Sequence, residues 1–151
     1  MGRKNTIRMF VELDKKGIAL GDTTEDRKAR KIFITNFYVQ WNISNTTKQI
    51  YNKHLKSFIE IRFLSLNETS RIASYRYKST LAVTFLTEIL ENAKKVSTEK
   101  PKANNQNQKR FSEMIIMEYE KADFGKVKLT VGVLRDSKLK IQYCITAIEN
   151  D

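Results

Sequence analysis

Residues 126–145, KVKLTVGVLRDSKLKIQYCI, decide the fold class more than any other stretch of the chain. Apolar residues occupy every second position on both sides of the turn signal at 135–137, which is the pattern of a hairpin with one buried face. A two-residue loop would place Val133 opposite Lys140 and mix the faces, whereas a three-residue loop places Val133 opposite Leu139. Because a one-residue slip turns every side chain over, we expect the three-residue loop. Its polar face would carry Lys126, Lys128, Lys138 and Lys140.

The first third of the chain predicts strands separated by polar segments. Residues 6–13 alternate apolar and polar side chains and would pair with 18–20 across a turn at Gly17. Residues 21–30 are polar and predict an exposed loop, with a helical turn as the alternative, while 31–41 are rich in β-branched and aromatic residues, as in a strand buried on both faces. A short helix capped at Ser44 or Asn45 would then extend to about Lys56.

The middle of the chain predicts a second hairpin. Residues 58–66 and 71–78 flank a three-residue connection at 67–69, and this register gives apolar pairs on one face and a Glu–Arg pair on the other. A helix beginning at Thr69 or Ser70 is the competing interpretation.

The second half of the chain begins with the clearest helical pattern. A wide apolar stripe predicts a helix from Ser79 or Thr80 to about Val96. Residues 97–110 form a polar, basic linker with the single proline, either disordered alone or ordered by a partner. Residues 111–120 suit a strand or a helix, and the Glu, Met and Lys content favours the helix slightly.

Together these elements predict an α+β fold. An antiparallel sheet built from β-hairpins would pack against one main amphipathic helix, with one or two short helices, in a single domain spanning residues 1–151. No apolar run reaches about 18 residues, and the N-terminus lacks an apolar signal-peptide stretch. We therefore expect a soluble cytoplasmic protein with no membrane partner.

Positive charge is the strongest compositional feature of the 151 residues. The formal net charge is +11, from 28 Lys and Arg against 17 Asp and Glu. Residues 1–66 carry 13 basic and 6 acidic side chains, and residues 94–110 carry 6 and 1, whereas residues 111–151 carry 6 and 7. This asymmetry indicates a face or arm that meets an anionic partner. A coding bias toward Lys, Asn and Ile would produce the same excess without selection for binding.

Catalytic and metal-binding motifs are missing from the sequence. The chain has one histidine, His54, and one cysteine, Cys144, which cannot form an internal disulfide or a Cys/His zinc site. It contains no glycine-rich phosphate loop, and the tripeptide at 123–125, Asp-Phe-Gly, stands without the other kinase motifs. We therefore expect a protein that is not an enzyme and uses no cofactor or metal, with a small nuclease as the minor alternative.

Basic residues interleaved with aromatic ones are the best functional signal. Cations neutralise phosphates, and exposed aromatic rings stack on unpaired bases, although the same aromatics could equally belong to a core. The candidate nucleic-acid-binding residues are Arg27, Lys28, Arg30, Lys31, Lys48, Lys53, Lys56, Tyr75, Arg76, Tyr77, Lys78, Lys94, Lys95, Lys100, Lys102, Lys109 and Arg110.

These features predict a basic accessory protein of the phage or mobile-element type. It would bind nucleic acid, RNA or single-stranded DNA, mainly through backbone electrostatics. The alternative is a protein–protein module, either a virion or assembly component or a phage-type inhibitor that docks on a host ribonucleoprotein such as a defence nuclease. In that case the positive charge would meet an acidic protein or a nucleoprotein complex.

Overall fold

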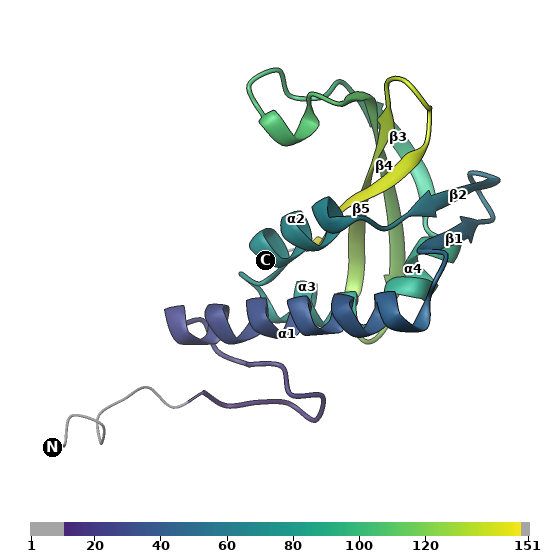
Figure 1. The fold of residues 1–151 in the computed structure, drawn as a ribbon. Helices are drawn as coiled ribbons and strands as arrows, with labels where there is room; N and C mark the ends of the chain where they lie inside the picture. Colours follow the sequence, from purple (N-terminus) through teal and green to yellow (C-terminus); the bar gives the residue numbers. More distant parts are fainter. Residues whose placement is uncertain (1–10, 149–151) are drawn as a thin grey trace, which may run out of the picture.

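A curled six-stranded sheet forms the centre of the structure, a computed structural model that describes residues 11–148 (Figure 1). The strands are β1 (Gln49–Asn52), β2 (Ser57–Glu60), β3 (Lys94–Glu99), β4 (Phe111–Lys121), β5 (Gly125–Leu134) and β6 (Lys140–Ile148). Their order across the sheet is β1-β2-β6-β5-β4-β3. Neighbours are antiparallel except β2 and β6, which run parallel. The predicted α+β class is confirmed.

The described part of the chain contains four α-helices: three pack on the face of the sheet that we call the inner face, and the second lies along the edge of β6 and also borders the opposite face. They are α1 (Thr24–Ser44), α2 (Phe63–Ala73), α3 (Tyr77–Val83) and α4 (Leu86–Asn92), and a short 3-10 helix follows at Gln106–Gln108. Every second residue of β5, from Val127 to Val133, points into the core that these helices share with the sheet. The helix that acts as the main one is α1, which runs along the base of the molecule in Figure 1.

Helix α1 begins inside the predicted loop at 21–30, where the sequence indicated at most a helical turn, and it replaces the strand predicted at 31–41, which is wrong. A capping box starts it: Thr23 and Asp26 bond to each other's backbone amides. Its buried side recurs at helical spacing through Arg30, Ile34 and Tyr38. Because the charged Arg30 occupies one of these buried positions, the helical period of apolar residues is incomplete in the sequence. The β-branched residues that follow it are typical of a strand, which explains the wrong prediction.

Strands β1 and β2 occupy the place of the helix predicted at 44–56 and the first arm of the hairpin predicted at 58–66, which corrects both. Ile50 pairs with Ile59, and the rings of Tyr51 and Phe58 meet edge to face with centroids 5.3 Å apart. Cross-strand pairs of β-branched and aromatic residues stabilise a hairpin. Four-residue strands are too short to show a clear period.

Helix α2 covers the edge of β6 and contains the segment predicted as a hairpin turn at 67–69. The competing helical interpretation was nearer, although α2 begins at Phe63 and not at Thr69. Ser65 donates to the Gln142 carbonyl at 2.5 Å, and the Gln142 side chain donates to Thr69 at 3.0 Å. The buried side of α2 is formed by polar residues that hydrogen-bond to β6. The sequence of α2 therefore lacks the apolar stripe by which a helix is usually recognised.

The helix predicted to extend from 80 to 96 is divided into α3 and α4. The break falls at Thr84 and Phe85, where the Thr84 hydroxyl donates to the Leu81 carbonyl at 2.6 Å. Helix α4 ends at Asn92, and the chain turns directly into β3. The single helix was therefore wrong in its length, because a hydroxyl that bonds to the backbone favours a helix end.

The segment predicted as a linker at 97–110 begins inside β3, and residues 111–120 form β4 and not the favoured helix. Strand β4 lies between β3 and β5, and Met114 to Met117 are four consecutive buried residues. Packing on both faces of a central strand outweighs the helix propensity of Met and Glu. The predicted single domain over 1–151 stays a prediction, and residues 6–10 of the predicted first strand lie outside the described residues. Leu13 does bridge to Ala19.

The hairpin of β5 and β6 is confirmed, but its predicted loop and register are wrong. Val133 pairs with Lys140, the pairing that we expected to be excluded, and a bulge then shifts the register between Thr130 and Val131. The pairing of Val133 with Lys140 turns Ile141 to the outer face, and the bulge at Tyr143 returns Ile145 to the inner core. The four hairpin lysines therefore do not form one polar face, since Lys140 donates to Ser57 on β2 at 3.1 Å.

Candidate nucleic-acid interface

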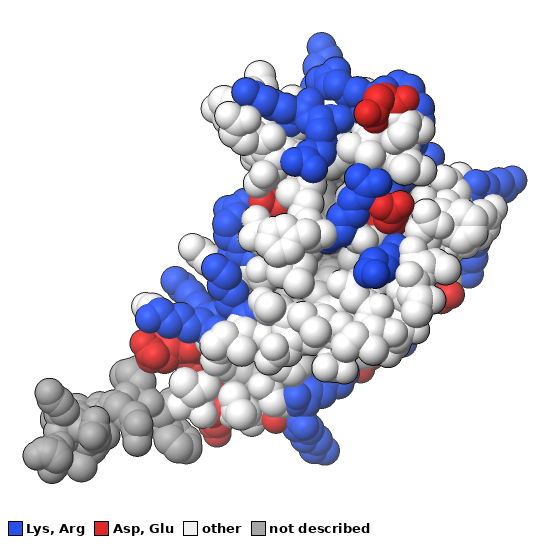
Figure 2. Space-filling model, in the orientation of Figure 1, with Lys and Arg blue, Asp and Glu red and all other residues white. Residues whose placement is uncertain are grey.

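Nearly all the predicted binding residues lie on the surface. All of them are exposed except Arg30, which is buried, and Tyr77, which is half-buried. Figure 2 shows Lys and Arg side chains spread over one face and gathered toward its upper end, around the 3-10 helix and the neighbouring sheet ends. Lys48 and Lys56 lie beside the hairpin of β1 and β2, and Lys109 and Arg110 follow the 3-10 helix.

Arg30 is a structural residue, which corrects its place among the binding candidates. Its guanidinium donates to four backbone carbonyls at 2.6–3.3 Å. Two belong to the segment before α1 and two to the turn between α2 and α3, so the side chain joins these parts. A guanidinium surrounded in this way cannot reach a phosphate. The acceptors are the carbonyls of Ala19, Gly21, Ser74 and Tyr75.

The predicted aromatic candidates have different surroundings. Tyr75 is 59% exposed, and the Arg27 guanidinium lies 5.0 Å from its ring centroid, so this pair presents a ring and a cation together. The Tyr77 hydroxyl donates to the Asp14 carboxylate at 2.5 Å. This hydrogen bond, with burial, raises the pKa of Tyr77 to about 12. Tyr75 therefore remains available for stacking, while Tyr77 is held by its acidic partner.

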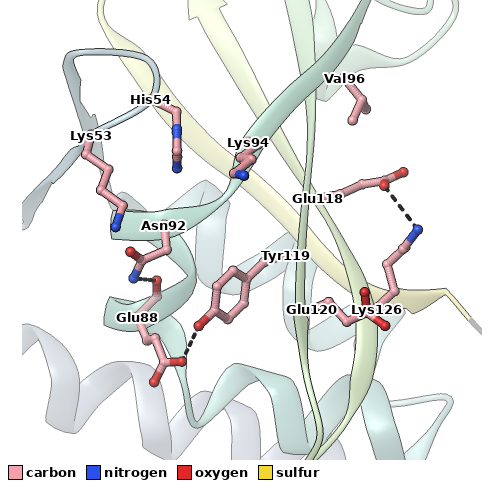
Figure 3. A pocket seen from close by; sticks show the side chains of 10 residues that line it. All are labelled: Lys53, His54, Glu88, Asn92, Lys94, Val96, Glu118, Tyr119, Glu120 and Lys126. Atoms are coloured by element: carbon pink, nitrogen blue, oxygen red, sulfur yellow. Dashed lines mark hydrogen bonds and ion pairs between the residues drawn. The ribbon is translucent and has the colours of Figure 1, made fainter.

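A wide cleft of about 600 Å³ lies at the edge of the sheet, and we call it the edge cleft (Figure 3). The turn after β1, helix α4 and strands β3, β4 and β5 line it. It includes two predicted residues, Lys53 and Lys94, and the only histidine. The lining residues are Lys53, His54, Glu88, Asn92, Lys94, Val96, Glu118, Tyr119, Glu120 and Lys126.

Acidic side chains offset the basic ones in the edge cleft. Glu118 is 3.7 Å from the ammonium of Lys126, and Glu88 accepts from the Tyr119 hydroxyl and is 3.0 Å from the Lys121 ammonium. The hydrogen bond from Tyr119, followed by Lys121, lowers the pKa of Glu88, so this carboxylate is charged at neutral pH. Mixed charge of this kind is a poor match for a polyanion.

A smaller cleft of about 240 Å³ lies on the outer face of the sheet, opposite the main core, and we call it the outer cleft. Its floor comes from β4, β5 and β6, and its walls from α2 and the segment after β3. Two predicted residues, Lys100 and Lys102, stand at this cleft. The lining residues are Glu68, Arg71, Ile72, Glu99, Lys100, Lys102, Asn105, Gln108, Met114, Ile116, Lys128, Thr130, Tyr143, Cys144 and Thr146.

Basic side chains predominate in the outer cleft because the buried carboxylate of Glu68 is already paired with other residues of the protein. Glu68 accepts from Arg71 at 2.7 Å on one oxygen and from the Asn107 amide at 2.6 Å on the other. This leaves Lys100, Lys102 and Lys128 against the exposed Glu99. The outer cleft therefore suits an anion better than the edge cleft does.

Sequence analysis missed Arg71 and Lys128 as members of this site. Lys128 was assigned to the polar face of a hairpin, which is the correct side of β5, but nothing in the pattern placed that face beside the segment after β3. Arg71 was assigned to a strand. The spacing of Glu68 and Arg71, three residues apart, is a helical ion-pair signal that could have indicated both the helix and the pair.

Cys144 is a buried thiol, with 7% of its surface exposed. Burial, with the nearby charge of Glu68, raises the pKa of Cys144 to about 12. Since the thiolate is the reactive form, we expect Ellman's reagent at pH 8 to label the native protein at least about 100-fold more slowly than the protein in guanidinium chloride. Equal rates in the two conditions would contradict this assignment.

His54 and Cys144 line different clefts, so the sequence's only imidazole and thiol do not meet. Within residues 11–148 no group of three or more His, Cys, Asp or Glu side chains is arranged to hold a metal ion. Over the same described range, no helix has the length and apolar character needed to cross a bilayer.

The fold and its clefts define a small basic α+β protein whose exposed lysines surround an outer-face depression. Residues 35–138 match the family described as large polyvalent protein-associated domain 3, and the chain belongs to this family. The family supports the predicted class, an accessory protein of the phage or mobile-element type. No curated protein and no solved structure gives a match to this chain. The family segment includes α2 to β5, and therefore most of the outer cleft.

Proposed function

We propose that this accessory protein binds nucleic acid, RNA or single-stranded DNA, mainly through its phosphate backbone. One observation supports the proposal above the others: lysines from two distant segments surround one depression of the sheet. Lys100 and Lys102 come from the segment after β3, and Lys128 comes from β5, while the acid beside them is neutralised by Arg71. Lysines that come together from distant parts of the chain are more specific evidence for a nucleic-acid-binding surface than a high overall charge.

The proposed activity is binding without catalysis or a cofactor, in the cytoplasm. The buried Cys144 thiol and the exposed His54 have no common site, which supports a binding role. Lysines that contact phosphates release counterions from the nucleic acid, and this release supplies affinity that does not depend on sequence.

Salt dependence tests the proposal most directly. We expect the logarithm of the association constant for a single-stranded oligonucleotide to fall linearly with the logarithm of salt concentration, measured by fluorescence anisotropy. Replacing Lys94, Lys95, Lys100 and Lys102 together by glutamine should make that slope shallower by about 0.7 for each phosphate that no longer meets a lysine. No binding of RNA or DNA at low ionic strength would overturn the proposal.

A second set of substitutions separates local contact from total charge. Lys15, Lys16, Arg62 and Lys138 are exposed basic residues outside β3, the segment after it and the set of binding candidates, and glutamine at these positions removes the same charge. We expect this control to reduce the slope less than the first set. Equal reductions would show that the segment from β3 onward makes no specific contact.

The alternative function is a protein–protein module, favoured by an apolar stripe on the exposed side of α1. Ile32 is 62% exposed, Val39 46% and Ile43 66%. Contiguous exposed apolar residues often mark a protein interface. Here the basic residues beside the stripe would face an acidic protein or a ribonucleoprotein, as for a virion or assembly component or a phage-type inhibitor. A co-purifying protein partner that resists high salt would favour this function.

A further inference from the structure

We propose that the outer cleft holds one unpaired nucleotide of a single strand, with a phosphate at its lysines and the base on its apolar floor. This inference rests on the proposed function and adds to it the place on the surface where an unpaired nucleotide binds. The lining of this cleft combines both kinds of surface that a nucleotide requires.

The floor of the outer cleft suits the face of a base. Met114 and Ile116 project from β4 onto the outer face, and the residues that they pair with across β5 are Gly132 and Thr130. Met114 and Ile116 are only 2% and 7% exposed and form the base of the cleft, while Ile72 of α2 beside them is 36% exposed and gives the cleft an open apolar side chain. Bases stack favourably on apolar and aromatic surfaces of this kind, whatever their identity.

The rim of the same cleft suits a phosphate and the polar edge of a base. Lys100, Lys102 and Lys128 provide ammonium groups, and Thr130 and Thr146 provide hydroxyls that can donate or accept. A ligand that uses the ammonium groups, the hydroxyls and the apolar floor together must carry both an anionic group and a heterocycle. A nucleotide has this composition.

The wall that carries two of these lysines is held in place before any ligand arrives. The Lys102 amide donates to the Gln108 side chain at 2.8 Å, and Asn107 donates to the buried Glu68 of α2. Gln108 is itself buried beside Tyr143. Because the segment is already ordered, a bound strand does not have to supply the entropy of ordering it.

The size of the outer cleft favours one nucleotide over a double helix. Its volume, about 240 Å³, is below the roughly 300 Å³ at which pockets begin to enclose a whole small molecule, so it has room for a base while the sugar and phosphate stay at the rim. A duplex keeps its bases stacked inside and presents no free base face to such a depression. We therefore expect a preference for single strands, in which a base can leave the stack at small cost.

Filling the cleft without changing its charge gives the sharpest test. Thr146 lines the cleft on β6 and is partly exposed, so Thr146→Trp should occupy the base position. Thr98→Trp, on the exposed β3 and outside the cleft lining, is the matched control. Affinities are measured by anisotropy for a 12-nucleotide single strand and for its duplex, and thermal unfolding checks that both variants fold.

We expect Thr146→Trp to weaken single-strand binding at least tenfold and duplex binding less than twofold, while Thr98→Trp changes neither by more than twofold. Lys128→Gln at the rim should weaken single-strand binding without filling the floor, which keeps the proposal testable if the tryptophan variant does not fold. Free adenosine monophosphate is the second probe, and it should bind more weakly than the strand.

The ways in which the proposal can fail are distinguishable. If salt-dependent binding persists but neither Thr146→Trp nor Lys128→Gln weakens it more than Thr98→Trp does, the cleft is not the site and the proposed function stands. If no nucleic acid binds at any salt concentration, the proposed function fails and the cleft assignment fails with it. If the mononucleotide binds as tightly as the strand, the cleft is a site for free nucleotides and the single-strand proposal is wrong.

Discussion

Replacing Arg30 by alanine is expected to lower the free energy of unfolding by about 3–5 kcal/mol, the range for breaking a buried polar network. The substitution leaves four backbone carbonyls without their donor and opens a cavity between α1 and the turn that follows α2. Each buried acceptor that loses its partner costs about 1–3 kcal/mol, although water entering the cavity recovers part of this. Urea denaturation measures the change.

Two further variants show whether the carbonyl contacts are the cause. Arg30→Lys keeps the charge but has one ammonium for four acceptors in two segments, so it should recover only part of the stability. Arg27→Ala removes an exposed arginine one turn earlier on α1 and should cost less than about 1 kcal/mol, chiefly its contact with the Tyr75 ring. Equal losses for Arg30→Ala and Arg27→Ala would show that Arg30 does not join the two segments.

Asn52 is the second position with a large expected effect, and Asn52→Ala should lower the free energy of unfolding by about 2–4 kcal/mol. Its amide donates to the carbonyls of Leu90 and Ala93 at 2.7 and 3.0 Å, and its oxygen accepts from the amides of His54 and Leu55 at 3.0 and 2.7 Å. This fully buried side chain therefore ties the hairpin of β1 and β2 to the end of α4.

The aspartate variant distinguishes the donor half of this contact from the acceptor half. Asn52→Asp keeps the oxygen that accepts from the turn but sets a carboxylate against two carbonyls, so we expect it to be at least as destabilising as Asn52→Ala. Asn45→Ala is the matched control, because the Asn45 amide makes a single hydrogen bond to the Trp41 carbonyl. Hydrogen exchange should also accelerate at the Lys53 amide, which donates to Glu91. An unchanged exchange rate at the Lys53 amide would contradict the role of Asn52 in joining the hairpin to α4.

The parts of the fold that were predictable are those with a long regular period and one apolar face. Strand β5 keeps its alternation from Val127 to Val133, so the sequence identified it and the hairpin that it begins. Its partner followed the same pattern, yet a bulge near Thr130 changes which side chains face the core. A bulge depends on how neighbouring strands twist and pack, and the residues of one strand do not encode it alone.

The candidate site was predictable only in part, because the position of a side chain in the site also depends on contacts between distant segments. Exposure of residues such as Lys100 and Lys102 follows from charge, because an unpaired ammonium is costly to bury. Arg30 broke this rule because four carbonyls from two distant segments surround it. Their positions depend on the complete fold, so its burial could not be inferred from its neighbours in sequence.

The amino-acid sequence by itself determined the α+β class, the central hairpin and the excess of positive charge in particular segments. These properties depend on composition and on local periodicity, and both can be read from the sequence without knowing which strands pair with each other. Tertiary structure alone decided that residues 24–44 form a helix, that β4 is a central strand, and that Lys128 lies at the same cleft as Lys100. Such outcomes require contacts between residues far apart in the chain, and the free energy of those contacts exceeds that of local propensity.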